Sequence, residues 1–199
     1  MKTLADKTAL KYRGRKAETY ESVRKKQLRW RLENEIVEKY LEESNVRGAR
    51  VLDVPTGTGR FLKMFTVLGA SSIVGIDSSN EMLALARKKK IRNAVLKQGD
   101  IRNLGDERFD IVVCVRYLDL IDQEAMRTAV REITRVASKA VILTIRLGDE
   151  YVLKSNTATH CEKAFQQLVQ KLKWRVDRSE TIFDAGWRVL KLIPKGDNK

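Results

Sequence analysis

A carboxylate and two glycines stand close together in the stretch VLDVPTGTGR, residues 51–60. Asp53 ends a short apolar run, and Gly57 and Gly59 follow it. Glycine lets a backbone approach a ligand closely, and free N–H groups at the start of a following helix favour negative charge. The carboxylate favours positive charge. The stretch therefore predicts a loop that binds a ligand carrying charges of both signs.

A dinucleotide fits this loop poorly. Its fingerprint, G-x-G-x-x-G, needs a third glycine where this chain has Leu62. Asp53 would also face a pyrophosphate of the same charge sign. S-adenosylmethionine carries a sulfonium, an ammonium and a carboxylate, so its cationic groups suit Asp53, and its carboxylate suits the helix N–H groups or Arg60. The residues therefore predict this cofactor.

Two further acidic residues stand where the next strands should end. Asp77 lies twenty residues beyond Gly57, a spacing at which an acid binds both ribose hydroxyls. Asp100 is placed to accept a hydrogen bond from an adenine amino group. Each acid also has a simpler interpretation, because Asp53 and Asp77 could cap helices and Asp100 could belong to a turn.

The hydrophobic pattern places these acids at one edge of a sheet. Short apolar runs predict buried strands, and apolar residues three and four apart predict helices between them. Such alternation favours a parallel sheet with helices on both faces, in which the loops after the first four strands meet at one crevice. We expect strands at 49–54, 72–77, 93–100, 109–118 and 140–147, a hairpin at 174–194, and helices at 28–43, 59–69, 78–90, 122–138 and 158–174.

Four segments resemble the class I S-adenosylmethionine-dependent methyltransferases. VLDVPTGTGRFL resembles their motif I, D-x-G-x-G-x-G, with Pro55 in place of the first glycine. VGIDSSNEMLALAR resembles their ribose segment, GDIRNL their adenine segment and FDIVVCVRYL their fourth-strand motif. The resemblance covers residues 48–148 in detail. It implies an α/β Rossmann-like fold, a single doubly wound, mostly parallel sheet of seven strands with an antiparallel C-terminal hairpin and helices on both faces.

The resemblance also implies which residues bind the cofactor. The loop after the first strand would hold the methionine portion, the second segment the ribose, the third the adenine edge, and the end of the fourth strand would pack near the sulfonium. Met82 fits a core position equally well. The implied cofactor-binding residues are Asp53, Pro55, Thr56, Gly57, Thr58, Gly59, Asp77, Ser78, Met82, Asp100, Ile101, Val115 and Arg116.

Methyl transfer is an in-line displacement, so the protein mainly positions two reactants, and a base helps an oxygen acceptor. Arg116 could bind an anionic acceptor or pair with an acid. His160 precedes an expected helix, which favours a surface or capping role, and Asp122 is the expected N-cap of the helix after it. The catalytic candidates are Tyr20, Arg116, Tyr117, Asp119 and His160.

The N-terminal arm, residues 1–31, is strongly basic, with eleven Lys and Arg but three Asp and Glu. In the family that the chain resembles, this segment commonly folds over the cofactor as a lid, where we place Tyr20, Arg24 and Trp30. In the helix at 28–43, the apolar face is expected to run through Leu28, Leu32, Ile36 and Tyr40, with Val37 and Leu41 beside them. The arm's charge suits either an anionic partner, nucleic acid included, or a solvated surface.

Three functions remain open from the sequence. Our first hypothesis is methyl transfer to a small molecule, or an anionic acceptor, bound under the arm. The second is a tRNA, rRNA or DNA methyltransferase that uses the basic surface. The fourth strand lacks the Asn/Asp-Pro-Pro-Tyr/Phe motif for exocyclic base amines and a following Pro-Cys for C5-cytosine chemistry. The third is a regulatory domain that binds the cofactor without catalysis.

Composition limits the remaining classes. The 199 residues, 43% of them hydrophobic, suit one globular domain rather than a disordered chain. No apolar run approaches the ~20 residues of a membrane span, so no membrane partner is predicted. The start of the chain lacks an apolar signal region, and the two cysteines, Cys114 and Cys161, show no metal-ligand spacing. We therefore predict a cytoplasmic protein without a metal site.

Overall fold

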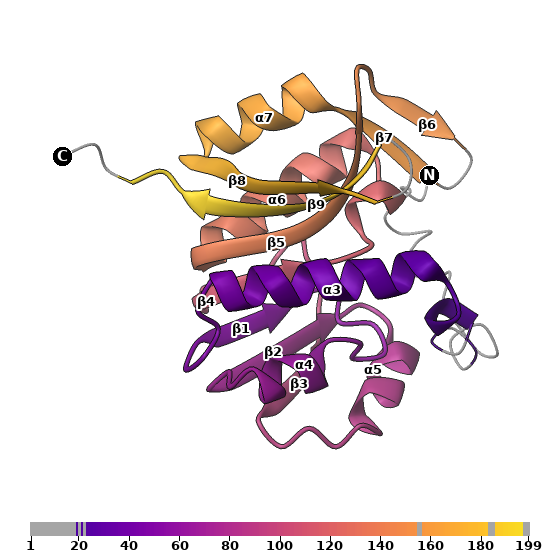
Figure 1. The fold of residues 1–199 in the computed structure, drawn as a ribbon, viewed down its shortest axis with the longest axis vertical. Coiled ribbons are helices and arrows are strands. Elements are labelled where there is room, and N and C mark those ends of the chain that lie inside the picture. Colours follow the sequence, from indigo (N-terminus) through magenta and orange to yellow (C-terminus); the bar gives the residue numbers. More distant parts are fainter. Residues whose placement is uncertain (1–18, 20, 22, 155–156, 183–185, 197–199) are drawn as a thin grey trace.

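Strands and helices alternate along the computed structural model, which describes residues 19, 21, 23–154, 157–182 and 186–196 (Figure 1). The strands in these residues are β1 Arg50–Asp53, β2 Ser72–Asp77, β3 Ala94–Gln98, β4 Phe109–Cys114, β5 Ala137–Gly148, β6 Val152–Lys154, β7 Thr157–Cys161, β8 Trp174–Thr181 and β9 Trp187–Pro194. The helices are α3 Leu28–Glu43, α4 Leu62–Val67, α5 Asn80–Arg87, α6 Gln123–Val136 and α7 Glu162–Lys171, with a 3₁₀ turn, η1, at Leu118–Leu120.

The main sheet runs in the order β3-β2-β1-β4-β5-β9-β8. Strand β1 pairs in parallel with β2 and with β4, so that Val51 lies opposite both Ile73 and Ile111. Strand β9 is antiparallel to β5 and to β8. The predicted mostly parallel sheet with an antiparallel C-terminal hairpin is confirmed, but β7 and β6 bring the described sheet to nine strands rather than seven. Because β1 to β4 run in the same direction, their carboxyl ends share one edge.

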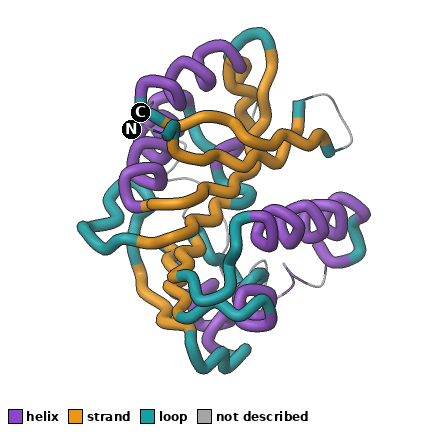
Figure 2. Tube along the Cα trace, turned by 60° about the vertical axis from the view of Figure 1, so that its left-hand side comes forward, coloured by secondary structure: helices purple, strands orange, loops and turns teal. Residues whose placement is uncertain are grey.

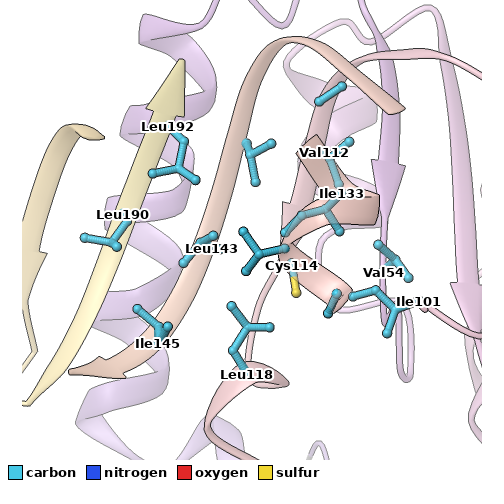
Figure 3. Close-up of a cluster of buried hydrophobic side chains, with 14 of the residues drawn as sticks. Val54, Ile101, Val112, Cys114, Leu118, Ile133, Leu143, Ile145, Leu190 and Leu192 are labelled. Atoms are coloured by element: carbon cyan, nitrogen blue, oxygen red, sulfur yellow. The ribbon is translucent and has the colours of Figure 1, made fainter. Parts of the chain in front are cut away.

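Helices cover both faces of this sheet (Figure 2). Successive side chains of β4 point to opposite faces, as a strand requires. Ile111 and Val113 belong to one buried cluster with residues of α3 and α4, whereas Val112 and Cys114 belong to the other with residues of α6 and α7. Figure 3 shows the second cluster, where Cys114 lies among residues of β5 and α6. Cys114 is thus a buried core residue.

A small hairpin, β6 with β7, extends the sheet and was not expected from the sequence. We expected a helix from residue 158, but the helix begins at Glu162 and Thr157–Cys161 is a strand. Burial alternates along it, with Ala158 and His160 buried and their neighbours less so. The strand joins the end of β5, where Leu147 pairs with His160. Threonine favours strands, and this pairing decides the local conformation.

Helix α3 begins and ends where the sequence predicts, and its predicted apolar face is confirmed in the second half, where Val37, Tyr40 and Leu41 are fully buried. In the first half the buried face differs, because Trp30 and Glu33 are buried and Leu28 is 49% exposed. The far end of α3 is fastened to the C-terminal hairpin, because Lys191 of β9 lies 2.9 Å from the Glu43 carboxylate. This attachment holds α3 across the sheet (Figure 1), with its N-terminal half above the carboxyl ends of the strands.

Cys114 and Cys161 are free thiols. Among the described helices, none combines the length and apolar character needed to cross a membrane. Residues 1–18 lie outside the description, so the assignment of residues 1–199 to one domain with residues 1–31 as arm or lid stays a prediction. Tyr20, a catalytic candidate, also lies outside the described residues.

Candidate active site

A cavity of about 220 Å³ opens at the carboxyl ends of β1, β2, β3 and β4. The loops after all four strands reach it, as the sequence predicts. The segment around the start of α3 lines it as well, through Arg24, Arg29 and Trp30, together with Trp187 of β9. The predicted cofactor-binding residues that line it are Pro55, Thr56, Gly57, Thr58, Asp77, Ser78, Met82, Asp100, Ile101, Val115 and Arg116.

The other two predicted cofactor residues, Asp53 and Gly59, do not line the cavity. Asp53 is 2% exposed, and its Oδ2 accepts a hydrogen bond of 2.7 Å from the Thr56 hydroxyl. Burial raises the pKa of Asp53 to about 7, against the lowering effect of that hydrogen bond. Gly59 has a φ of +74°, and a Cβ there would lie 2.6 Å from Leu62 Cδ1. Both residues therefore support the conformation of the loop without lining the cavity.

The loop after β1 is tied to the end of β2 by Asp77. The Gly57 N–H donates to Asp77 Oδ2 at 2.7 Å, and the Ser79 N–H donates to Oδ1 at 2.9 Å. Burial raises the pKa of Asp77, and these N–H donors oppose the rise. The carboxylate therefore serves the loop and the start of α5 together. It also lines the cavity, so the capping interpretation does not displace the ligand-binding one.

Glycine at position 57 keeps the cavity floor open. Its φ is +55°, a conformation that side chains disfavour, and a Cβ there would lie 3.6 Å from Met82 Cε. Met82 is buried and lines the same cavity. The exposed backbone of a glycine beside the Asp77 carboxylate suits a ligand that carries cationic groups and hydroxyls. The residues present therefore fit S-adenosylmethionine.

Asp100 is a turn residue that also lines the cavity, and its hydrogen bond to the adenine stays a prediction. The backbone N–H of Arg102 donates to its Oδ1 at 2.9 Å, which makes it a turn residue. The Arg102 guanidinium also holds its carboxylate through Nε and Nη2. Asp100 and Arg102 line the cavity beside Ile101.

A buried charged cluster lies where α3 meets the cavity. Glu33 is fully buried, and its Oε2 lies 2.9 Å from Arg60 Nη1 and 3.3 Å from Arg116 Nε. Arg60 also donates to Asn34 Oδ1 at 2.9 Å and to the Trp30 carbonyl at 2.7 Å. The expectation that Arg60 binds the cofactor carboxylate is not supported, because its guanidinium donates its hydrogen bonds to residues of α3.

Asp119 is the buried carboxylate of the cavity wall after β4. It is 3% exposed, and its Oδ1 has no hydrogen-bond partner among the described residues. Burial raises its pKa to about 6, while Arg116 and Arg29 act in the opposite direction. Tyr117 lies beside it in the lining, and burial raises the pKa of its hydroxyl. A carboxylate with a free oxygen and this pKa can accept a proton near neutral pH.

His160 is buried rather than exposed, so its predicted surface or capping role is wrong. Its ring Nε2 lies 2.7 Å from the carbonyl of Leu118, and it does not line the cavity. Because His160 belongs to β7, its ring contacts η1, the turn that contains Asp119. The expected N-cap at Asp122 is confirmed, since its Oδ1 accepts from the Ala125 N–H at 2.9 Å.

Three residues of the cavity end near α3 were missed from the sequence: Glu33, Arg29 and Trp187. For Glu33 a signal existed, because it stands on the same helical face as Trp30, Val37 and Tyr40. A glutamate within an otherwise apolar buried face needs partners, which points to a functional cluster. Trp187 gave no signal, since it reaches the cavity only through the pairing of β9 with β5.

Comparisons with known proteins agree with this architecture. Residues 51–140 match the family model described as a methyltransferase domain. Together with the sheet order and the cavity, the match shows a methyltransferase domain of the class I S-adenosylmethionine-dependent type in this part of the chain.

Among curated proteins, the phosphatidylethanolamine N-methyltransferase of Cereibacter sphaeroides is 33% identical over 140 residues, 67% of this chain and 66% of that relative. The match thus spans just under two thirds of the relative's length. Among solved structures, the DhpI–SAM–HEP complex aligns with a TM-score of 0.77 at 17% identity, over 98% of this chain and 99% of that one. Magnesium protoporphyrin IX methyltransferase from Synechocystis PCC 6803, with bound SAH, aligns with a TM-score of 0.72 at 17% identity, over 82% of each chain. At these identities the two structures establish the fold.

Proposed function

We propose that this chain transfers the methyl group of S-adenosylmethionine to a small-molecule acceptor bound beneath the start of α3. One observation carries the proposal. A single cavity runs from the loops after β1, β2 and β3 to the buried charged cluster against α3. The curated relative and one of the two solved structures are named after different acceptors, and the other structure's name gives no acceptor. The acceptor of this chain must therefore be inferred from its own residues.

The loop end of the cavity is the proposed cofactor site. Asp77 would accept hydrogen bonds from the ribose, Gly57 leaves room for the ligand against the backbone, and Met82 and Ile101 offer apolar contacts to the adenine. When bound, the cofactor supplies a methyl carbon whose bond to the sulfonium breaks, with the electron pair passing to sulfur. Two reactants held in one cavity would have the positioning that this displacement needs.

The α3 end of the cavity is the proposed acceptor site. Asp119 Oδ1, buried and without a partner among the described residues, would take the proton of an O–H or N–H nucleophile as that atom bonds to the methyl carbon. Trp30 and Trp187 line this end and help to exclude water. Such exclusion strengthens the charge interactions inside.

Calorimetric titration with S-adenosylhomocysteine tests the cofactor site directly. Wild-type protein should bind it, and Asp77→Ala should bind about 1–3 kcal/mol more weakly, the scale of lost charge-assisted hydrogen bonds. Asp149→Ala, at an exposed position away from the cavity, is the matched control and should bind like wild type. Absence of binding by the wild type would refute the proposed function.

A nucleic-acid acceptor stays a prediction, since most of the basic arm lies outside the described residues. Repeating the titration with bulk tRNA at low and moderate salt separates the two acceptors. Binding of tRNA that weakens steeply with salt and changes the affinity for S-adenosylhomocysteine would favour the nucleic acid. The cytoplasmic location also stays a prediction, consistent with the two free cysteines.

A further inference from the structure

The charged residues of the cavity are distributed unevenly between its two ends. At the loop end, after β2 and β3, stand Asp77 and Asp100, and Asp100 is paired with Arg102. Arg29 and Arg116 stand at the α3 end, and both guanidiniums approach the same ring, that of Trp187. Their Cζ atoms lie 4.2 Å and 5.8 Å from its centroid. A cavity built in this way presents cationic groups where the acceptor is proposed to bind.

Arg116 is held firmly and lacks a full set of partners. Its side chain is only 10% exposed. Its backbone has a φ of +63°, which a residue with a side chain adopts only when its surroundings require it, and its N–H donates to the Thr144 hydroxyl at 2.7 Å. Nη2 is buried with no hydrogen-bond partner in the described part of the chain. A buried guanidinium N–H left unpaired is costly unless a ligand completes it.

Glu33 does not neutralise this end of the cavity. Its carboxylate is shared between Arg60 at 2.9 Å and Arg116 at 3.3 Å. Asp119 offers a second negative charge, so two carboxylates face the three guanidiniums of Arg29, Arg60 and Arg116. Burial and the nearby Arg116 charge lower the pKa of Arg29, which agrees with an excess of positive charge.

We propose that Arg116, together with Arg29, binds an oxyanion group, a carboxylate or a phosphate, carried by a compact acceptor. The inference rests on the proposed function, because that function places an acceptor at this end of the cavity. A planar guanidinium with free N–H groups matches an oxyanion in geometry as well as in charge. The bound anion would supply the partner that Nη2 lacks.

The test measures binding rather than turnover. Calorimetry on the full chain saturated with S-adenosylhomocysteine would use three probes: benzoate, inorganic phosphate and, as the cationic counterpart, benzylamine. At least one anion should bind and benzylamine should not. Benzoate alone would identify a carboxylate acceptor and phosphate alone a phosphorylated one. Equal binding of benzylamine, or no binding of either anion at millimolar concentration, would overturn the proposal.

Two substitutions locate the anion. Arg116→Met should weaken anion binding about tenfold or more, as expected for loss of a charge-assisted pair, and Arg29→Met should weaken it in the same direction. Arg131→Met, which removes an exposed guanidinium of α6, is the charge-matched control. Thermal unfolding checks that each variant folds; if Arg116→Met does not, Arg29→Met decides.

The affinity for S-adenosylhomocysteine separates this inference from the proposed function. It should stay near wild type in Arg29→Met, because Arg29 lines the cavity outside the predicted cofactor site. An equal loss of S-adenosylhomocysteine binding in this variant would mean that the cofactor's own carboxylate occupies this end of the cavity, which would overturn the inference and leave the proposed function standing. Failure of the wild type to bind S-adenosylhomocysteine would refute the proposed function itself.

Discussion

Asp53 shows how one buried residue can support a site without touching it. The sequence places it in motif I, and the structure puts its carboxylate beneath the loop, hydrogen-bonded to Thr56. Burial raises its pKa to about 7, so the folded chain holds its proton more tightly than the unfolded chain, whose ordinary value is 3.8. Ionisation of Asp53 near neutral pH therefore lowers the free energy of unfolding, and it places a negative charge near the cavity.

The variant Asp53→Asn should reveal this cost. A group whose folded pKa is raised destabilises the fold above that pKa, and the penalty disappears as pH falls from about 7 towards 4. The amide cannot ionise, so the variant should be more stable than wild type at pH 8, by roughly 2–4 kcal/mol, and the advantage should shrink towards pH 5. Urea unfolding at both pH values measures it. An equal difference at the two pH values would contradict the raised pKa.

The sequence predicted the residues at the loop end of the cavity better than those at the α3 end. Gly57, Asp77 and Asp100 each follow their own strand, so local sequence and strand order suffice to bring them together. Arg29 and Trp187 come from opposite ends of the chain. No local pattern announces their meeting, because it depends on how α3 and β9 pack against the sheet.

At the scale of elements, the start of α3 lines the proposed acceptor end of the cavity, and the C-terminal hairpin contacts the far end of α3. Lys191 of β9 is 5% exposed and reaches both Glu43, at 2.9 Å, and Asp177, at 3.0 Å. The hydrogen bond from Lys191 lowers the pKa of Glu43. A buried ammonium of this kind ties a helix to a hairpin far away in the chain.

Lys191→Met keeps the apolar stem and removes the charge. Two carboxylates then lose their shared partner, so the free energy of unfolding should fall by about 1–3 kcal/mol at pH 7. The loss should be smaller at pH 4, because a lowered carboxylate pKa contributes stability that is lost as pH falls and the carboxylates that pair with Lys191 become protonated. Urea unfolding at the two pH values measures it, with Lys63→Met at an exposed position of α4 as the control. Undiminished stability at pH 7 would show that packing alone holds α3.

The strand β7 marks where element prediction failed. Residues 158–161 stand directly before the apolar pattern of α7, so the helix pattern was extended backwards over them. Their burial alternates with the period of a strand, and the partner that selects this conformation is the end of β5. A segment this short takes its structure from its neighbour, and the neighbour cannot be identified from the segment's own composition.

At the scale of the whole molecule, the order of strands and helices was enough to predict the main sheet. Alternating apolar runs permit few arrangements once crossovers must be right-handed, and the arrangement of the main sheet is among them. The burial pattern within α3 was predicted correctly only for its second half, because the apolar spacing continues through Leu28, whereas packing at the cavity end buries Trp30 and Glu33 instead. Ligand binding at the loop after β1 should raise the free energy of unfolding of the whole fold.

Gly57→Ala tests that coupling. S-adenosylhomocysteine at about 100 times its Kd should stabilise wild type by about 2.7 kcal/mol and raise its Tm by several degrees. Alanine at φ +55° strains the loop whose Gly57 N–H bonds Asp77, and it adds a methyl group to the cavity lining, so the variant should lose most of the ligand-induced rise. Gly105→Ala is the matched control: its φ is +67°, and its Cβ would meet nothing within 4 Å. It should show a similar loss of Tm without ligand but keep the full rise with it. If both variants keep the rise, the loop after β1 does not bind the cofactor, and the fold alone would no longer justify placing the site there.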